Sequence, residues 1–361
     1  MSPPTTGRQL SEGVIMMFEE IHAGGCCSYL IACAETCCGV LVDPELSQID
    51  RTLALIAKAG VRLQYVVDTH THADHFSASR ELARRLGVPA VMHSASAAPY
   101  VDLRVDDGET LIAGHLRVRV LHTPGHTADS ISLVLPDRVL TGDTLLRLAT
   151  GRTDLPTGNP EALYDSLFGK LLRLDDRVAV YPGHNYKDTP VTTIGQEKAE
   201  NARLQKRDRA AFVEQMCALN LSMPDHLTEA LRTNRTGGKT VAQLLDEAAR
   251  QIAFMSMEEV RARVAAGSDD LAILDVREGD AYEAGHIPGA RHAPRGQLDL
   301  RVDQLLPDPT ARVLTCCEFG KISTLAAATL RTLGFTRAVA LDGGMKTWRD
   351  AGYPIKSGKE P

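Results

Sequence analysis

The stretch THTHADHF, residues 69–76, places three histidines and one aspartate within six positions: His70, His72, Asp74 and His75. Two imidazoles two residues apart in an extended loop lie on the same side of the chain. The adjacent Asp74 and His75 add further donors, and the whole set suits one or two metal ions. The loop directly follows the apolar run Leu63–Val67, so we expect a buried strand to deliver it.

Three later segments supply further potential ligands. TPGH ends in His126, TGD ends in Asp143 and YPGH ends in His184. Each follows a predicted strand, at 116–121, 138–140 and 178–181 respectively. Strand ends are where α/β proteins usually place their chemistry, because a rigid sheet holds the side chains there. The sequence therefore predicts a metal centre assembled from four separate loops.

A second reactive pattern lies downstream in TCCEFGKIST, residues 315–324, where a predicted strand leads through a glycine-bearing loop into a helix. Backbone N–H groups of such a loop, together with the helix N-terminus, stabilise an anion at the sulfur of a cysteine. Consecutive strand residues face opposite sides, so Cys316 and Cys317 do not share one environment. Cys317 stands at the mouth of the loop, and Cys316 is expected in the strand core.

Composition narrows the classes of function. The chain has 361 residues, 43% hydrophobic and 24% charged, with a net charge of −6, so nothing indicates nucleic-acid binding. No apolar run reaches the roughly eighteen residues of a membrane span, and the N-terminus lacks the pattern of a secretory signal. The eight cysteines are clumped rather than spaced as a disulfide framework. We therefore expect a cytoplasmic protein with reduced thiols and no membrane partner.

The alternation of predicted strands and helices changes character after His184 and starts afresh near Ser256. We expect an N-terminal tail at 1–13, a first domain at 14–240, a linker at 241–255 and a second, smaller α/β domain at 256–358.

The motifs THTHADH, TPGH, TGD and YPGH, in this order, resemble the signature of the metallo-β-lactamase superfamily. The resemblance implies an αββα sandwich with a metal at one edge. Two branches compete: glyoxalase II, a dinuclear thioesterase, and the persulfide dioxygenase branch, which holds one Fe(II). In the dioxygenase branch the implied iron ligands are His70, His126 and Asp143. The remaining motif residues would either hydrogen-bond to these ligands without touching the iron or stand at vestigial second-metal positions: His72, Asp74, His75 and His184.

Three features favour the dioxygenase branch. GRTD at 151–154 resembles its arginine-containing loop, which implies that Arg152 positions the glutathione carboxylate or orders the loop that does. YPGHNY resembles a segment that places Tyr186 near the metal, although Asn185 replaces the usual acid. The chain also lacks room for the large glutathione-binding helical domain of glyoxalase II. The entry segment differs from the usual type, and two interpretations of its cysteines stay open: Cys26 and Cys27 border the pocket, or they are thiols that pack in the core of a hairpin.

LDVREGDAYEAGHIPGA (274–290) and LDGGMKTWRDAGYP (341–354) resemble the flanking signatures of a rhodanese domain, an α/β domain with a parallel sheet. The resemblance makes Cys317 the nucleophile. Ile322 replaces the usual arginine, and Lys321 is the nearest substitute. The implied persulfide loop consists of Glu318, Phe319, Gly320, Lys321, Ile322 and Ser323.

The combined resemblance is to bacterial persulfide dioxygenase–rhodanese fusions. It implies oxidation of glutathione persulfide by O₂ to sulfite and glutathione, with glutathione as the sulfur carrier. It also implies that Cys317 interconverts thiosulfate plus glutathione with sulfite plus glutathione persulfide. Two alternatives stay open: a glyoxalase II-like dinuclear thioesterase fused to a sulfurtransferase, and a sulfur-carrier or sensing protein that works through its cysteines and not through a metal. The oligomeric state, a homodimer included, is not fixed by the sequence.

Overall fold

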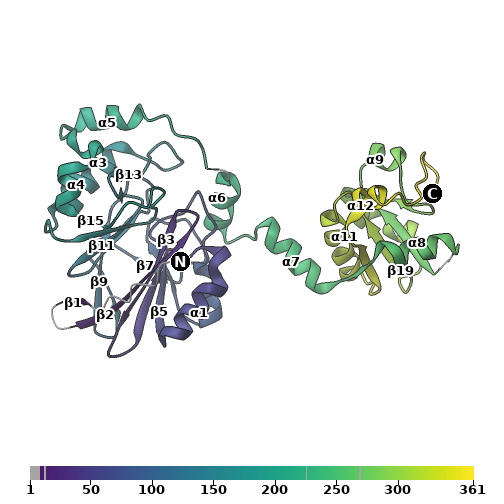
Figure 1. The fold of residues 1–361 in the computed structure, drawn as a ribbon, viewed down its shortest axis with the longest axis horizontal. Coiled ribbons are helices and arrows are strands. Elements are labelled where there is room, and N and C mark those ends of the chain that lie inside the picture. The colour runs from purple at the N-terminus through teal and green to yellow at the C-terminus, as the bar shows by residue number, and fades with distance from the viewer. Residues whose placement is uncertain (1–8, 12–13, 225, 268–269) are drawn as a thin grey trace. The chain divides into compact units, whose positions relative to one another are not determined.

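The computed structural model describes residues 9–11, 14–224, 226–267 and 270–361. The chain forms two compact units, one ending at Gly238 and the other beginning at Lys239 (Figure 1). Of the expected tail at 1–13, residues 9–11 form a short strand, β1 (Gln9–Ser11), and the rest lies outside the described residues.

The first unit is a sandwich of two sheets. The seven-stranded sheet runs in the order β1–β2–β3–β4–β5–β6–β7, and the six-stranded sheet in the order β15–β14–β11–β10–β9–β8. The first sheet comprises β1, β2 (Val14–Ala23), β3 (Cys26–Cys33), β4 (Cys38–Val42), β5 (Arg62–Val67), β6 (Ala90–His93) and β7 (Leu103–Val105). The second comprises β8 (Thr110–Ala113), β9 (Leu116–His122), β10 (Ile131–Val134), β11 (Arg138–Gly142), β14 (Ala179–Pro182) and β15 (Thr192–Thr193).

Alternation along the strands places one apolar set between the sheets and another beneath the helices. Ile31 and Val40 of the first sheet pack with Val118 and Leu133 of the second. Helices α1 (Ile49–Ala59) and α2 (Ser79–Leu86) cover the outer face of the first sheet. Helices α3 (Pro160–Gly169), α4 (Ile194–Glu200) and α5 (Arg209–Cys217) cover the second sheet. The expected αββα sandwich is confirmed.

The second unit is built on a five-stranded parallel sheet, β16–β20–β19–β17–β18, which confirms the expected α/β domain. The strands are β16 (Ala253–Met255), β17 (Leu271–Asp275), β18 (Arg291–His292), β19 (Arg312–Cys316) and β20 (Ala338–Leu341). The helices are α7 (Val241–Gln251), α8 (Met257–Ala265), α9 (Gly279–Ala284), α10 (Leu298–Leu305), α11 (Lys321–Thr332) and α12 (Gly344–Asp350). Separate hydrophobic clusters pack on the two faces of the sheet.

The linker expected at 241–255 is not a separate segment. Residues 241–251 form α7, which packs on α11. Strand β16 pairs in parallel with β20 at the edge of the five-stranded sheet of the second unit. A capping box at Thr240 and Gln243 starts α7 immediately after the division between the units. Among the described residues, no helix combines the length and the apolar character needed to cross a membrane.

Gly344 lets α12 pack directly on the loop that follows β19. A Cβ atom at Gly344 would lie 2.7 Å from the backbone oxygens of Cys317 and Glu318, and its φ of +72° is in the left-handed region. Gly334 has a φ of +103°, but a Cβ atom added there would have nothing within 4 Å, so it serves as a matched control. Substitution of the two glycines by alanine therefore separates the steric cost of a Cβ atom from the cost of a left-handed backbone conformation in the free energy of unfolding.

We therefore expect Gly344→Ala to lower the free energy of unfolding of the second unit by about 2–4 kcal/mol, against about 1 kcal/mol for Gly334→Ala. The measurement is denaturant unfolding of the full chain followed by fluorescence of Trp348. This residue is the only tryptophan of the chain and is fully buried in the second unit. Equal losses in the two variants would contradict the packing argument.

Candidate active sites

The histidine loop begins where β5 ends and is fixed to both sheets by its backbone. Asp43, which follows β4, accepts hydrogen bonds from the Thr69 N–H at 2.6 Å and from the Thr69 hydroxyl at 2.8 Å. The Thr69 carbonyl accepts a hydrogen bond from the N–H of Ile131, in β10 of the other sheet, at 2.7 Å. The loop therefore stands at the junction of the two sheets.

His70, His126 and Asp143 form a first group of potential metal ligands. Their side chains are buried, and one donor atom from each lies within 4.8 Å of the others. His126 Nε2 lies 3.7 Å from Asp143 Oδ2. His70 Nε2 is buried without a hydrogen-bond partner among the described residues, which is costly for a polar atom. A bound metal ion would satisfy it, so these residues fit the metal that the motifs predict.

Hydrogen bonds behind the three side chains orient them for metal binding. His126 Nδ1 donates to the carbonyl of Arg152 at 2.8 Å, which leaves Nε2 free for a metal. His184 Nδ1 lies 2.8 and 3.0 Å from the two carboxylate oxygens of Asp143. Burial and the neighbouring His72 lower the pKa of His70 to about 3, so its imidazole is neutral at pH 7.

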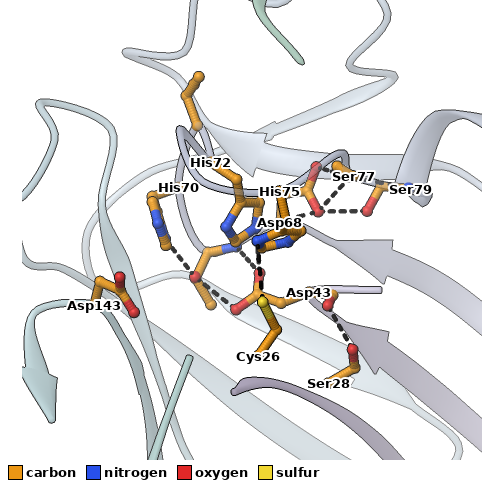
Figure 2. Close-up of polar contacts among 12 residues, drawn as sticks. Cys26, Ser28, Asp43, Asp68, His70, His72, His75, Ser77, Ser79 and Asp143 are labelled. Carbon is orange, nitrogen blue, oxygen red and sulfur yellow. Dashed lines mark hydrogen bonds and ion pairs between the residues drawn. The ribbon is translucent and has the colours of Figure 1, made fainter. Parts of the chain in front are cut away.

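His72 lies beside His70, with ring centroids 4.2 Å apart, but its Nε2 is directed at two other carboxylates. Its Nε2 is 3.2 Å from Asp43 and 3.8 Å from Asp68, and all three side chains are buried (Figure 2). Burial and the charge of His75 oppose protonation of His72, but the two carboxylates raise its pKa. Nε2 thus supports the loop, whereas Nδ1 is buried without a hydrogen-bond partner among the described residues and, like His70 Nε2, is available to a metal ion.

Asp74, His75 and His184 gather around Cys26, which the motif does not include. The four side chains again place one donor atom each within 4.8 Å of the others. The Cys26 sulfur lies 3.4 Å from His184 Nε2 and 3.7 Å from His75 Nδ1. Cys26 was expected either to border the pocket or to pack in the hairpin core, whereas the structure places its thiol among these potential ligands.

The second candidate site follows β19 in the second unit. Cys317 is buried on one face of the sheet with Val313 and Ala327, whereas Cys316 is buried on the opposite face with Leu314. The Ser323 N–H donates to the Cys317 sulfur at 3.2 Å, so the loop does direct a backbone donor at this thiol. Burial raises the pKa of Cys316 well above its ordinary value, which leaves that thiol protonated at neutral pH.

The rim of this loop is largely apolar. Phe319 and Ile322 are 66% and 49% exposed, and Lys321 is exposed beside them. Glu318 forms ion pairs with Arg277, at 3.2 Å, and with Arg349, so both nearby guanidinium groups already face a carboxylate. A pocket of about 450 Å³ lies next to the loop, lined in part by Phe319, Gly320, Lys321 and Thr324. Apart from Lys321, no cation of the described loop replaces the arginine that the rhodanese pattern has at position 322.

Comparison with known proteins decides the family. The Metallo-beta-lactamase superfamily model matches residues 23–184, and the Rhodanese-like domain model matches residues 256–351. The mitochondrial persulfide dioxygenase ETHE1 of Bos taurus is 34% identical over 241 residues, which covers 64% of this chain and 94% of the relative. The chain belongs to the persulfide dioxygenase family of the metallo-β-lactamase superfamily. It is an enzyme with a dioxygenase domain and a C-terminal rhodanese sulfurtransferase domain.

Two solved structures share the fold of this chain. ETHE1 from Myxococcus xanthus is 42% identical with a TM-score of 0.60, and the match covers 62% of this chain and 99% of that one. A metallo-beta-lactamase from Staphylococcus aureus, 20% identical with a TM-score of 0.58, shares the fold over 90% of this chain and 98% of its own. The hydroxyacylglutathione hydrolase of Anaeromyxobacter dehalogenans is 38% identical over 160 residues, 44% of this chain and 61% of the relative. The persulfide dioxygenase match is thus the more extensive of the two enzyme types.

In the dioxygenase domain, the guanidinium of Arg152 is already paired. It forms a bidentate ion pair with Asp154, with both contacts at 2.7 Å, and donates to the Ser222 carbonyl at 2.6 Å. The backbone carbonyl of the same residue holds His126. Of the two roles expected for Arg152, these contacts favour ordering of the loop over direct contact with a substrate carboxylate.

Tyr186 stacks on the ring of His184, with centroids 4.9 Å apart and planes 11° apart. Its side chain is 66% exposed, so it lies at the outer rim of the dioxygenase site. The ring also packs over Gly25, where a Cβ atom would come within 2.6 Å of it. A glycine at that turn is therefore required for this stacking.

Asn234 supports the dioxygenase site but was not predicted. From helix α6 (Leu227–Thr236), its buried amide donates to the carbonyls of His72 and His75 at 2.9 and 2.8 Å. Its amide oxygen accepts from the Ser77 N–H at 3.0 Å. The residue lies more than 150 positions from the loop, and the turn-rich segment around it gave no local signal.

Removal of this amide should loosen the ligand loop. We expect Asn234→Ala to weaken metal binding by roughly 10–100-fold, the range found for residues that orient ligands. Competition with a chelator measures the affinity, and Thr236→Ala, an exposed change in the same helix, is the control. Unchanged metal affinity in Asn234→Ala would mean that the histidine loop keeps its conformation without the hydrogen bonds from the Asn234 amide.

The two roles of Arg152 predict different effects of substituting Arg152 and its ion-pair partner Asp154. If the residue orders the loop, Arg152→Gln and Asp154→Asn should both lower metal affinity, by roughly tenfold, with little change in KM for the persulfide. If it binds the substrate, only Arg152→Gln should raise KM. Metal content and steady-state kinetics of the two variants, measured side by side, decide between these outcomes.

Proposed function

We propose that the dioxygenase domain oxidises glutathione persulfide with O₂, using one Fe(II), and that the rhodanese domain moves sulfane sulfur through Cys317. The observation that carries the first part is the buried group of His70, His126 and Asp143. Two imidazoles and one carboxylate are a ligand set that suits non-haem Fe(II), and three protein ligands would leave coordination positions open. The activities are assigned to residues 14–240 and 256–358. A cytoplasmic location and a homodimer stay predictions.

Bound by these three residues, Fe(II) supplies the redox chemistry by which dioxygen oxidises the outer persulfide sulfur. The balance is one persulfide, one O₂ and one water giving one thiol, one sulfite and two protons. The chain itself contributes orientation and charge. The Arg152 carbonyl orients His126, and His184 orients Asp143. Because Asp143 would be the only charged ligand of a divalent ion, the site would keep a net positive charge that attracts an anionic persulfide.

In the rhodanese domain the Cys317 thiolate attacks the outer sulfur of thiosulfate. The sulfur–sulfur bond breaks, sulfite leaves with the electron pair, and Cys317 becomes a persulfide. A glutathione thiolate then attacks the terminal sulfur, which restores Cys317 and releases glutathione persulfide. The Ser323 N–H, 3.2 Å from the sulfur, stabilises the anion in both states. The pocket beside Phe319 offers space for the thiol carrier.

A dinuclear thioesterase is the second candidate, because Asp74, His75 and His184 form a further ligand group beside the first. It would hydrolyse a glutathione thioester and would consume no oxygen. Oxygen uptake with glutathione persulfide, compared with hydrolysis of a glutathione thioester by the same preparation, separates the two candidates.

The two proposed activities should be separable by single substitutions. We expect His126→Ala to abolish iron binding and persulfide-dependent O₂ uptake while thiosulfate sulfurtransferase activity is largely kept. Cys317→Ser should do the reverse, because the two residues lie in different units. Cys316→Ser is the matched control and should keep both activities.

Mass spectrometry after treatment with thiosulfate completes this test. One added sulfur should appear on the peptide that holds both cysteines and should vanish in Cys317→Ser alone. Full iron occupancy in His126→Ala would overturn the ligand assignment. An added sulfur that vanishes only in Cys316→Ser would overturn the assignment of the nucleophile.

A further inference from the structure

Glu318 directly follows the proposed nucleophile Cys317 and is held by helix α12. The Met345 N–H donates to the Cys317 carbonyl at 2.8 Å, and the Lys346 N–H donates to the Glu318 carbonyl at 3.0 Å. The same helix carries Arg349, whose guanidinium forms an ion pair with the Glu318 carboxylate. One helix therefore fixes both the backbone and the side chain of the residue next to the nucleophile.

The second guanidinium that contacts Glu318, that of Arg277, is engaged through all three of its nitrogen atoms. It donates to the two carboxylate oxygens of Asp275 at 2.9 and 2.6 Å, to the Gly285 carbonyl at 2.7 Å and to Glu318 at 3.2 Å. Arg277 and Asp275 are both buried. A small anion could bind this guanidinium only by breaking buried hydrogen bonds, which is costly.

The carboxylates around these two arginines cancel their charge. Arg349 and Arg277 hold the pKa of the Glu318 carboxyl below its ordinary value, so the group is ionised at neutral pH. Glu318 balances the charge of Arg349, and Asp275 balances that of Arg277. The two guanidinium groups beside the nucleophile thus add no net positive charge to the site.

A sulfur donor for Cys317 must therefore approach a loop with little positive charge. Ile322 stands where the rhodanese pattern has an arginine, and Lys321 is the cation that the loop itself carries. Thiosulfate is a small dianion, whereas an organic thiosulfonate or persulfide brings a single negative charge to the reacting sulfur. Repulsion by the Cys317 thiolate is therefore stronger for thiosulfate, and the site does little to offset it.

The pocket of about 450 Å³ beside the loop suits an apolar group. It is lined in part by Leu245 of α7, Phe254 of β16 and Phe319 of the loop. Phe254 and Phe319 are 47% and 66% exposed, so an apolar ligand group between them would remove their rings from water. Thiosulfate has no such group, whereas the organic part of a thiosulfonate or persulfide can occupy the pocket.

We propose that Glu318 is a specificity-determining residue, which disfavours thiosulfate and leaves monoanionic organic donors, thiosulfonates and organic persulfides, as the preferred substrates of the rhodanese domain. The inference rests on the proposed sulfur transfer through Cys317 and names its donor class. Thiosulfate stays a substrate, with weaker binding. Glu318 acts through Arg349 and Arg277 and not by contact with the donor.

With a thiosulfonate, the transfer needs no further reactant. The Cys317 thiolate attacks the outer sulfur of the donor, and the sulfur–sulfur bond of the donor breaks. The organic sulfinate leaves with the electron pair, and Cys317 becomes a persulfide anion. Thiosulfate and a thiosulfonate thus react at the same bond and differ only in the charge and the apolar group of the part that leaves.

Thiosulfate and benzenethiosulfonate therefore test the proposal on the full-length protein, with cyanide as the acceptor. Glu318→Gln keeps the shape of the side chain and removes its charge. We expect it to lower KM for thiosulfate by on the order of tenfold and to change KM for benzenethiosulfonate by less than about twofold. The gain should shrink as ionic strength rises. Because the two donors differ in intrinsic reactivity, the readout is the change in the ratio of their kcat/KM values.

Glu259→Gln is the matched control. The Glu259 carboxylate also pairs with two guanidinium groups, those of Arg263 at 3.1 Å and Arg312 at 3.6 Å. Arg312 begins β19, whereas Glu318 lies in the loop after the end of this strand. The control variant thus removes the same charge at the opposite end of the strand, and the ratio should stay unchanged.

The two guanidinium-dependent and apolar parts of the proposal have separate tests. Arg349→Leu added to Glu318→Gln should cancel the gain for thiosulfate, because the guanidinium that Glu318 had neutralised is then absent. Phe319→Ala should raise KM for benzenethiosulfonate several-fold and leave KM for thiosulfate unchanged. Leu300→Ala is the control for this loss of apolar surface, because Leu300 is 83% exposed on α10, away from the residues that line the pocket.

An unchanged ratio in Glu318→Gln, or an equal effect on both donors, would overturn the proposal while the proposed sulfur transfer stands. Mass spectrometry of the peptide that holds Cys317 checks the transfer itself. If neither donor adds sulfur to Cys317, in the wild-type protein or in Glu318→Gln, the proposed sulfur transfer fails, and the donor preference fails with it.

Discussion

The metal centre depends on backbone hydrogen bonds that join the two sheets of the sandwich at one edge. The Ile131 N–H donates to the Thr69 carbonyl, and the Cys27 N–H donates to the Gly183 carbonyl. Each bond connects a loop of one sheet with an element of the other. His70 belongs to the first sheet, whereas His126, Asp143 and His184 belong to the second, so the ligands converge only because the sheets are registered at this edge. Side-chain hydrogen bonds then refine an arrangement that the backbone has already set.

This edge also concentrates ionisable groups in the interior, where an unpaired charge is strongly unfavourable. The protein meets this constraint by grouping them: Asp43 and Asp68 face His72, Asp143 faces His184, and Asp74 faces His75 and His184. Burial opposes ionisation of Asp143, but His184, His126 and His70 hold the pKa of this carboxyl below its usual range. A carboxylate that stays ionised inside the protein is also one that a metal ion binds without first displacing a proton. The ion pairs that offset the cost of burying these charged groups therefore also keep the carboxylates in the ionised form that binds a metal.

The sequence was most informative where the signal is local. The strands predicted at 63–67 and 116–121 fall within one residue of β5 and β9, because each has a clear apolar pattern that ends at a polar residue. The polar stretch 195–221 does not form one continuous helix, because Asn201 ends α4 and Asp208 caps the start of α5. The supposed linker is a helix whose partner, α11, lies about 80 residues away in sequence. The same limit applies to the site: His70, His126 and Asp143 could be named from motifs, whereas Cys26 and Asn234 reach it through long-range contacts that no motif records.

The paired cysteines of the two domains follow one rule. In CC at 26–27 and at 316–317, alternation along the chain turns the two thiols to opposite sides, and in each pair only one of them meets a group that stabilises its anion. Burial raises the pKa of Cys27 to about 12 and that of Cys316 well above its ordinary value. Burial also acts on Cys26, but hydrogen bonds from His184 and His75 outweigh it and bring its pKa to about 7. In the other pair, Cys317 receives the Ser323 N–H. Each adjacent pair is thus one thiol placed for chemistry beside one that packs, and neither needs its neighbour as a redox partner.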